Sequence, residues 1–227
     1  MNWITNFLTS SIGRKLIMSL TGLFLIIFLI VHLAGNLQLL KSDGGEAFNI
    51  YAYFMTTNPL IKFLSIGLYA GILLHAIIGL LLWSKNRKAK GGKYAVSTYE
   101  NGSFASKNMA ILGTIVLVFL FIHMGDFWWK MKFGEVPLTS YESIDYQVKD
   151  LYMKVSETFS KPLFIGLYIV GMIGLGFHLW HGFASAFQTL GINHKKYTPI
   201  IAGLGKFYAV VVSLAYAIIP IYFYLMK

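Results

Sequence analysis

The chain contains no cysteine among its 227 residues. Without thiols it cannot form a disulfide, hold zinc or an iron–sulfur cluster through thiolates, or attach haem covalently. Charge is also scarce, since Asp, Glu, Lys and Arg make up 12% of the chain. Soluble domains carry roughly twice that share. These two absences exclude a disulfide scaffold and argue against a soluble globular domain.

The charge that is present has one dominant sign, with a formal net charge of +10. In a soluble protein this excess would suggest a nucleic-acid partner. Here long apolar runs separate the basic residues, and no basic stripe with interleaved aromatic residues is visible. We therefore expect no nucleic-acid partner and interpret the charge as loop charge that orients the chain in a bilayer.

Long hydrophobic runs are abundant, and 56% of the residues are hydrophobic. A helix needs about 20 apolar residues to cross a bilayer core. The runs are continuously apolar rather than alternating, which excludes membrane-spanning strands. The sequence predicts an all-α integral membrane protein, a single membrane domain over 1–227. Its five transmembrane helices are expected at about 16–40, 60–83, 108–130, 162–190 and 200–226.

The N-terminal run resembles a signal peptide because Arg14 and Lys15 precede it. It is too long for such a segment and no small-residue cleavage site follows, so we expect an uncleaved helix. With five helices, 11 of the 19 Lys and Arg residues lie on the side of the N-terminus. This bias predicts a cytoplasmic N-terminus and an outer C-terminus. Trp128 and Trp129 end the third run, where interfacial aromatic anchors are expected.

Five of the six histidines lie inside apolar runs, where an ionisable residue is costly and is a functional candidate. The depth of each histidine follows from its distance along the helix to the flanking basic residues, at about 1.5 Å per residue. By this measure four of the histidines fall into two layers. His32 and His123 fall toward the outer face, and His75 and His178 toward the inner face. Neutral imidazole is a common ligand of haem iron, and a bis-histidine haem needs one such pair. His194 lies in a polar loop and is expected to be solvated.

Glycines accompany two of these histidines at intervals of four residues. One stripe consists of His75 with Gly67, Gly71 and Gly79. The second consists of His178 with Gly166, Gly174 and Gly182. Small residues of this kind leave room for a flat macrocycle or for a neighbouring helix, and helix packing remains the alternative explanation. His181 lies outside the stripe, so His178 is the preferred ligand of the fourth helix.

The segment 143–160 mixes apolar and polar residues at near-helical spacing. It is either an amphipathic helix on the outer surface or an ordinary loop.

With these residues in place, the chain resembles the five-helix, di-haem cytochrome b subunits of succinate dehydrogenase and fumarate reductase. The resemblance covers essentially the whole chain and rests on two local motifs. The first is the run 32–36 together with 45–49 and 54–55, which is similar to the family's first helix and outer loop. The second is 164–191, where the family's ligand precedes one glycine by four residues and a terminal glycine by thirteen. His178 fits both spacings through Gly182 and Gly191.

The resemblance implies two haem b groups with His32, His75, His123 and His178 as axial ligands of the iron. The pair His75 and His178 would hold the proximal haem, and His32 with His123 the distal one. It further implies flavoprotein and iron–sulfur partner subunits on the cytoplasmic side, a bacterial cytoplasmic membrane and a quinone substrate, with menaquinone expected. Glu46 lies where the family has an acidic residue linked to quinone protonation.

Three questions stay open at the level of the sequence. Asp126, one turn past His123, is a second carboxylate that could carry protons, and Glu46 leads only by resemblance. The complex could run toward fumarate reduction, or the chain could be a stand-alone di-haem cytochrome. A transporter with histidines as a proton relay is a further alternative, which would bind no chromophore.

Overall fold

The computed structural model describes residues 2–89 and 103–226. It contains five helices that are long and apolar enough to cross a membrane, which confirms the predicted all-α membrane architecture. The first spanning segment is α2 (Ser11–Asn36), which continues into the short 3₁₀ helix η1 (Leu37–Leu40), and the second is α4 (Pro59–Ala89). The third is α6 (Met109–His123), with its π-helical continuation η2 (Met124–Trp129) and the turn α7 (Lys130–Phe133). The fourth and fifth are α9 (Pro162–Thr189) and α10 (Thr198–Leu225).

The helices begin where the local chemistry favours a start. Ser10 precedes α2, and its hydroxyl accepts a hydrogen bond from the Gly13 amide at 3.0 Å. Asn58 does the same for α4, with its side-chain oxygen accepting from the Leu60 amide. Such side chains satisfy amides that have no partner within the helix. Pro162 then opens α9, where a missing amide proton costs nothing.

Helix α4 extends beyond the apolar run from which it was predicted. The run ends at Trp83, but the helix continues to Ala89. Its last turns contain Lys85, Arg87 and Lys88, which are good helix formers and carry the charge that a helix C-terminus favours. Hydropathy measures the membrane core, so it underestimates a helix that continues into water. The connection that follows, over 90–102 with the basic residues Lys90 and Lys93, lies outside the described residues.

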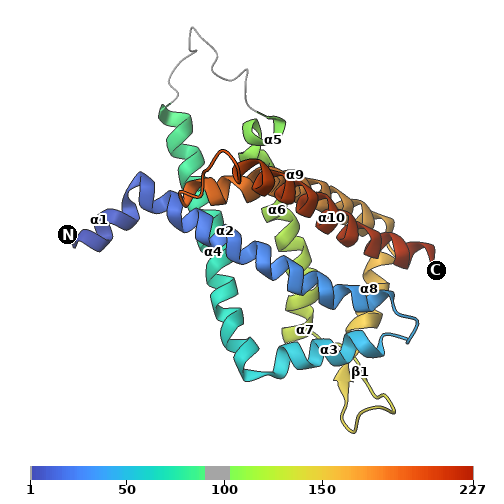
Figure 1. The fold of residues 1–227 in the computed structure, drawn as a ribbon. Coiled ribbons are helices and arrows are strands. Elements are labelled where there is room, and N and C mark those ends of the chain that lie inside the picture. The colour runs from blue at the N-terminus through green and yellow to red at the C-terminus, as the bar shows by residue number, and fades with distance from the viewer. Residues whose placement is uncertain (1, 90–102, 227) are drawn as a thin grey trace.

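The connections on the side predicted to lie outside, called the outer side, are more ordered than the sequence suggested. A helix, α3 (Glu46–Thr57), lies across the ends of α2 and α4 within the segment expected only as a connection (Figure 1). The segment 143–160 divides in two. Its first part belongs to a small hairpin in which β1 (Leu138–Thr139) pairs antiparallel with β2 (Val148–Lys149). Its second part forms α8 (Leu151–Phe159), so the amphipathic-helix alternative holds for the second half only.

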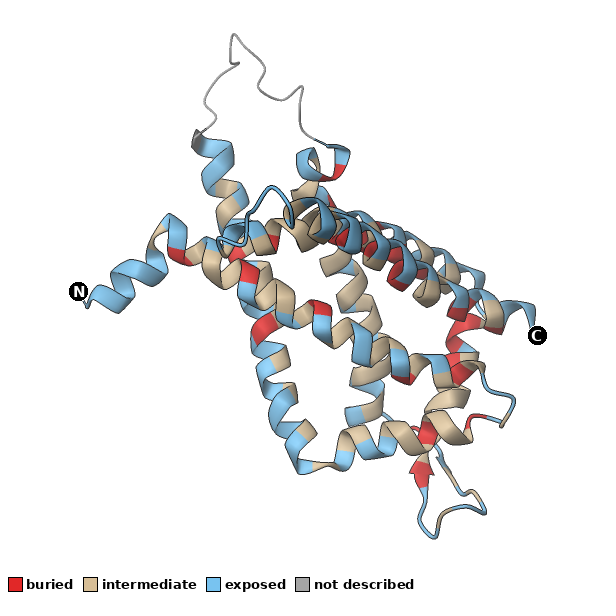
Figure 2. Cartoon of the chain, viewed as in Figure 1, coloured by how far each residue is buried: buried red, intermediate tan, exposed pale blue. Residues whose placement is uncertain are grey.

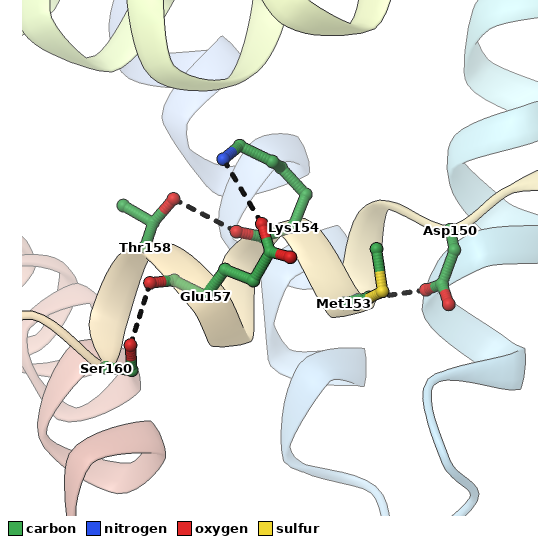
Figure 3. Close-up of polar contacts among 6 residues, drawn as sticks. All are labelled: Asp150, Met153, Lys154, Glu157, Thr158 and Ser160. Atoms are coloured by element: carbon green, nitrogen blue, oxygen red, sulfur yellow. Dashed lines mark hydrogen bonds and ion pairs between the residues drawn. The ribbon is translucent and has the colours of Figure 1, made fainter. Parts of the chain in front are cut away.

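Helix α8 is held by its own polar groups. The Asp150 carboxylate accepts from the Met153 amide at 2.9 Å and caps the helix start. Farther along, Lys154 forms an ion pair with Glu157 at 3.6 Å, and its carbonyl accepts from the Thr158 hydroxyl (Figure 3). These contacts fix α8 as a short helix on the outer side of the bundle. Two small helices complete the described chain, α1 (Trp3–Thr9) and α5 (Phe104–Lys107).

One buried side chain ties these outer elements together. Asn49 on α3 is 1% exposed. Its amide donates to the Tyr141 hydroxyl at 2.8 Å and to the Asp150 carboxylate at 3.0 Å, while its oxygen accepts from the Tyr152 amide at 2.9 Å. Every polar group of Asn49 is therefore used, as a buried amide requires. The motif 45–49 thus has a structural role: it docks the hairpin and α8 onto α3.

The packed core lies where α9 and α10 run side by side and meet α2, α6 and α8, whereas α4 is largely exposed (Figure 2). One cluster at the outer end is Leu39, Val155, Phe159, Tyr168, Ile219 and Phe223. A second, deeper cluster is Ile26, Met172, Leu175, Leu179 and Ala209.

The glycine stripes serve this packing at most of their positions. A Cβ at Gly71 or Gly79 would lie 3.3 Å from a side chain of α2, and one at Gly174 would lie 2.7 Å from Ile115 of α6. Gly182 faces Met109 of α6 at 3.5 Å, while Gly67 and Gly166 have nothing within 4 Å. The stripes therefore identify two close helix pairs, α2 with α4 and α6 with α9.

Candidate functional site

Four helices bring the four predicted histidines together as two facing pairs. His32 on α2 and His123 on α6 have ring centres 5.8 Å apart, with the planes at 82°. His75 on α4 and His178 on α9 have ring centres 6.2 Å apart, with the planes at 70°. The pairs are those expected from the depth of each residue along its helix.

Aromatic rings surround His32 and His123, the pair predicted to lie toward the outer face and called the outer pair. Phe28 stacks on His32 at 5.2 Å, and Tyr216 of α10 lies 5.9 Å from the same ring. Phe119 stacks on His123 at 5.7 Å, and Tyr168 approaches that ring at 6.0 Å. Asn36 supports the backbone here, since its side chain donates to the His32 carbonyl at 2.7 Å. This apolar enclosure favours neutral imidazole rings, because an unpaired charge is costly to bury.

His75 and His178, the pair predicted to lie toward the inner face and called the inner pair, have different surroundings. The Thr21 hydroxyl of α2 lies 3.1 Å from Nδ1 of His75. A Cβ at Gly22 would lie 3.3 Å from the same ring, and one at Gly113 would lie 3.6 Å from the His178 ring. These two glycines let α2 and α6 approach the histidines of the neighbouring helices closely.

Two other histidines stand apart from the pairs. His181 is one turn beyond His178 on α9 and belongs to neither facing pair. His194 is exposed in the loop before α10, where its Nδ1 accepts from the Lys196 amide at 3.2 Å. A role of His194 in shaping this loop agrees with its polar surroundings in the sequence.

The two pairs fit a metal held between two imidazoles. Rings that ligate one ion from opposite sides, each at about 2 Å, have centres roughly 6 Å apart. Nδ1 of His123 and Nδ1 of His178 are buried without a hydrogen-bond partner, and such atoms need an explanation in a stable fold. In the described part of the chain no group of three or more His, Asp or Glu side chains is arranged to hold a metal.

The two candidate carboxylates have different surroundings. Asp126 lies in the π-helical segment η2, and its Oδ2 accepts from the Tyr168 hydroxyl at 3.5 Å. The Tyr168 side chain is 5% exposed and reaches the ring of His123. Glu46 is the first residue of α3, and its carboxylate accepts from the Ser143 hydroxyl of the hairpin. Contacts therefore connect Asp126 with the outer histidine pair and Glu46 with the outer loops.

Positive charge surrounds Asp126 on the outer side. Lys130, Lys154 and Lys161 are close enough to act on it electrostatically. A pocket of about 310 Å³ is lined by Lys130, by the residues that precede the hairpin, and by Met153, Lys154 and Glu157 of α8. Two of the three lysines around Asp126 therefore also line a pocket, whereas Asp126 itself does not.

A comparison with curated proteins finds a relative of known role. The chain is 29% identical over 168 residues to the succinate dehydrogenase cytochrome b558 subunit of Bacillus subtilis (strain 168), and the match covers 74% of this chain and 73% of that protein. The resemblance to succinate dehydrogenase cytochrome b anchors is confirmed. No protein-family model matches the chain, and no solved structure gives a significant match.

Several residues that contact the two histidine pairs were not anticipated from the sequence. Thr21 and Gly22 contact His75 from another helix, and Tyr168 and Tyr216 do the same for the outer pair. A signal for Thr21 exists, because it is a polar residue in an apolar run, three turns before His32. Nothing in the sequence shows which neighbouring helix it faces.

Proposed function

We propose that this chain is the cytochrome b membrane-anchor subunit of a succinate:quinone oxidoreductase. It holds two b haems and carries electrons between an iron–sulfur subunit and a membrane quinone, with menaquinone as the expected substrate. The observation that carries the proposal is the presence of two facing histidine pairs at two levels of one helix bundle. The similarity to a succinate dehydrogenase cytochrome b558 subunit supports the same role.

Each pair would hold one haem iron through its imidazole rings. His75 and His178 would hold the proximal haem near the cytoplasmic partner subunits, and His32 and His123 the distal haem near the outer face. When bound, haem iron supplies a centre that accepts and releases one electron at a time. The protein excludes water from the outer pair with aromatic rings, and it fixes ring orientation at the inner pair from α2.

The chain also needs partners. It has no cysteine to hold an iron–sulfur cluster, so succinate oxidation belongs to a flavoprotein and an iron–sulfur subunit. These partners would dock on the cytoplasmic side of a bacterial cytoplasmic membrane, with the N-terminus of this chain on the same side and the C-terminus outside. Co-purification of both partners separates this role from that of a stand-alone cytochrome.

Reduction of a quinone also needs a proton carrier near the outer haem. Glu46 is the candidate by resemblance, and Asp126 is the candidate by contact with Tyr168 and the outer pair. Replacing each acid by its amide keeps the shape and removes the proton. Quinone reduction by the assembled complex should fall in E46Q if Glu46 carries the proton, and in D126N if Asp126 does. Electron transfer to an artificial acceptor by the soluble subunits is the control.

The decisive experiment is a reduced-minus-oxidised visible spectrum of the purified protein with haem counted per polypeptide. Two b haems per chain are expected. Replacement of His178 by Ala should remove one of them, and replacement of His123 should remove the other. H181A is the matched control on the same helix and should keep both. A folded wild-type chain without haem would overturn the proposal and favour the transporter alternative.

A further inference from the structure

The hydroxyl of Thr21 forms hydrogen bonds within its own helix. It lies 2.7 Å from the Ile17 carbonyl and 3.1 Å from the Met18 carbonyl, both one turn earlier on α2. A threonine hydroxyl has one proton, and this back-bonding geometry places that proton on a carbonyl of α2. Toward any other partner the same oxygen can only accept.

The partner that it faces is a ring nitrogen of the inner pair. Nδ1 of His75 lies 3.1 Å from the Thr21 oxygen. With its proton on the nearer Ile17 carbonyl the Thr21 oxygen accepts, and Nδ1 then carries the hydrogen and donates it. The Met18 carbonyl is a second hydrogen-bond partner of the His75 ring, and it too can only accept. A neutral imidazole has one N–H, so Nε2 keeps its lone pair. We propose that Thr21 is a positioning residue that holds His75 in the Nδ1–H tautomer and presents Nε2 as the iron ligand.

The backbone beside Thr21 supports this role. A Cβ on Gly22 would lie 3.3 Å from Cε1 and 3.7 Å from Nδ1 of His75, so this edge of the ring rests against α2. The hydrogen bond and the glycine therefore act on the same ring edge, one by attraction and one by leaving space. Together they restrict rotation of the imidazole about its own axis.

His178, the other member of the pair, lacks such a partner. Its Nδ1 is buried and has no hydrogen bond. The two ligands of the proximal haem are thus unequal, because His75 has the Thr21 hydroxyl and the Met18 carbonyl as partners and Nδ1 of His178 has no hydrogen bond. A hydrogen bond from Nδ1–H makes a histidine more basic toward its metal. A more basic ligand stabilises ferric over ferrous iron, so Thr21 would keep the potential of this haem low.

This inference rests on the proposed function, and its test uses three variants of the full chain purified with its partners. T21V removes the hydroxyl and keeps the branched shape. T21S keeps the hydroxyl. T114V is the matched control, since Thr114 also bonds to a carbonyl one turn back but is exposed on α6. Haem per polypeptide and the midpoint potential of each haem are measured by visible spectroscopy during redox titration.

We expect T21V to raise the midpoint potential of one haem and leave the other unchanged, or to lose that haem selectively. Loss of an outer-shell partner typically weakens metal binding 10- to 100-fold. T21S and T114V should retain two haems with wild-type potentials. The inference is overturned if T21V retains both potentials, or if T21S or T114V shifts them as much as T21V does. A wild-type chain without haem would instead overturn the proposed function itself.

Discussion

Replacement of Asn49 by Ala should loosen the outer layer of the protein. Asn49 is buried on α3 and makes three hydrogen bonds, to Tyr141, Asp150 and the Tyr152 amide. After truncation the Tyr152 amide at the start of α8 has no acceptor. The Asp150 carboxylate keeps one donor, the Met153 amide.

The magnitude follows from these bonds. An orphaned buried donor costs about 1–3 kcal/mol, and each lost bond between satisfied groups costs about 1 kcal/mol. With one orphaned amide and two further bonds lost, the variant should destabilise the docking of α8 by about 3–5 kcal/mol. Since each 1.4 kcal/mol is a factor of ten, local opening should become about 100- to 4000-fold more frequent.

Hydrogen exchange measures this opening directly. Exchange of the peptide that covers the start of α8 is followed in wild type, in Asn49→Ala and in Asn6→Ala, which changes an exposed asparagine of α1. Protection of the Tyr152 amide should fall only in the Asn49 variant. If protection stays within about threefold of wild type, the network does not hold α8 and the reasoning fails.

Three further predictions concern packing and pH. Ala at Gly45 should lower stability by at least about 2 kcal/mol, because this residue has φ +91° and a Cβ would lie 2.3 Å from the Tyr152 ring. Ala at Gly171 should cost about 1–3 kcal/mol by overpacking, since its Cβ would lie 2.4 Å from the Phe119 ring; a lowered melting temperature checks both. Burial raises the pKa of Tyr141 above its ordinary value, so the fold favours the neutral phenol. The stability from this group is complete below about pH 10 and is lost as pH rises through the folded-state pKa. Thermal unfolding at rising alkaline pH should therefore show a smaller loss in Tyr141→Phe than in wild type.

Each packing prediction has a matched glycine as its control. Gly44 also has a positive φ, of +65°, but nothing lies within 4 Å of its Cβ position. G44A therefore reports backbone strain without the collision. Gly166 has open space on the same helix as Gly171, so G166A should be nearly neutral. If each control destabilised as much as its counterpart, close packing would not explain the losses.

The sequence predicted the arrangement along each helix well. Helical rise converts residue number into depth, so His32 and His123 could be assigned to one layer and His75 and His178 to another. The structure brings together these same pairs. Membrane helices also have strong length and composition requirements, which is why the five spans were recognisable from the apolar runs.

Contacts between helices could not be predicted in the same way. The glycine stripe around His75 identified a packing face of α4, but not that α2 covers it with Thr21 and Gly22. The helix α3 was missed because its residues have no long apolar run. Its position depends on the buried bonds of Asn49 to residues about a hundred positions away.

The π-helical segment η2 is the clearest example of a feature that could not be predicted from the sequence. It begins directly after His123 and contains Asp126 and Trp128. Trp128 donates to the Tyr69 hydroxyl of α4 at 2.8 Å, in addition to the interfacial role expected of it. Asp126 accepts from Tyr168 of α9, on another neighbour. A π-helical turn often marks a functional site, and here it joins α6 to two helices beside the outer pair.

The two histidine pairs therefore differ in the chemistry available beside them. Beside the inner pair the Thr21 hydroxyl lies 3.1 Å from Nδ1 of His75, and within the described residues no carboxylate contacts either ring. The outer pair touches Tyr168, which leads to Asp126 and to lysines beside a pocket on the outer surface. Proton exchange needs a titratable group that reaches both the site and water. Near the outer pair the candidate is Asp126, and beside His178 of the inner pair it is the half-buried His181. The carboxylate near the outer pair supports the quinone chemistry proposed there, and it does so for electron flow in either direction.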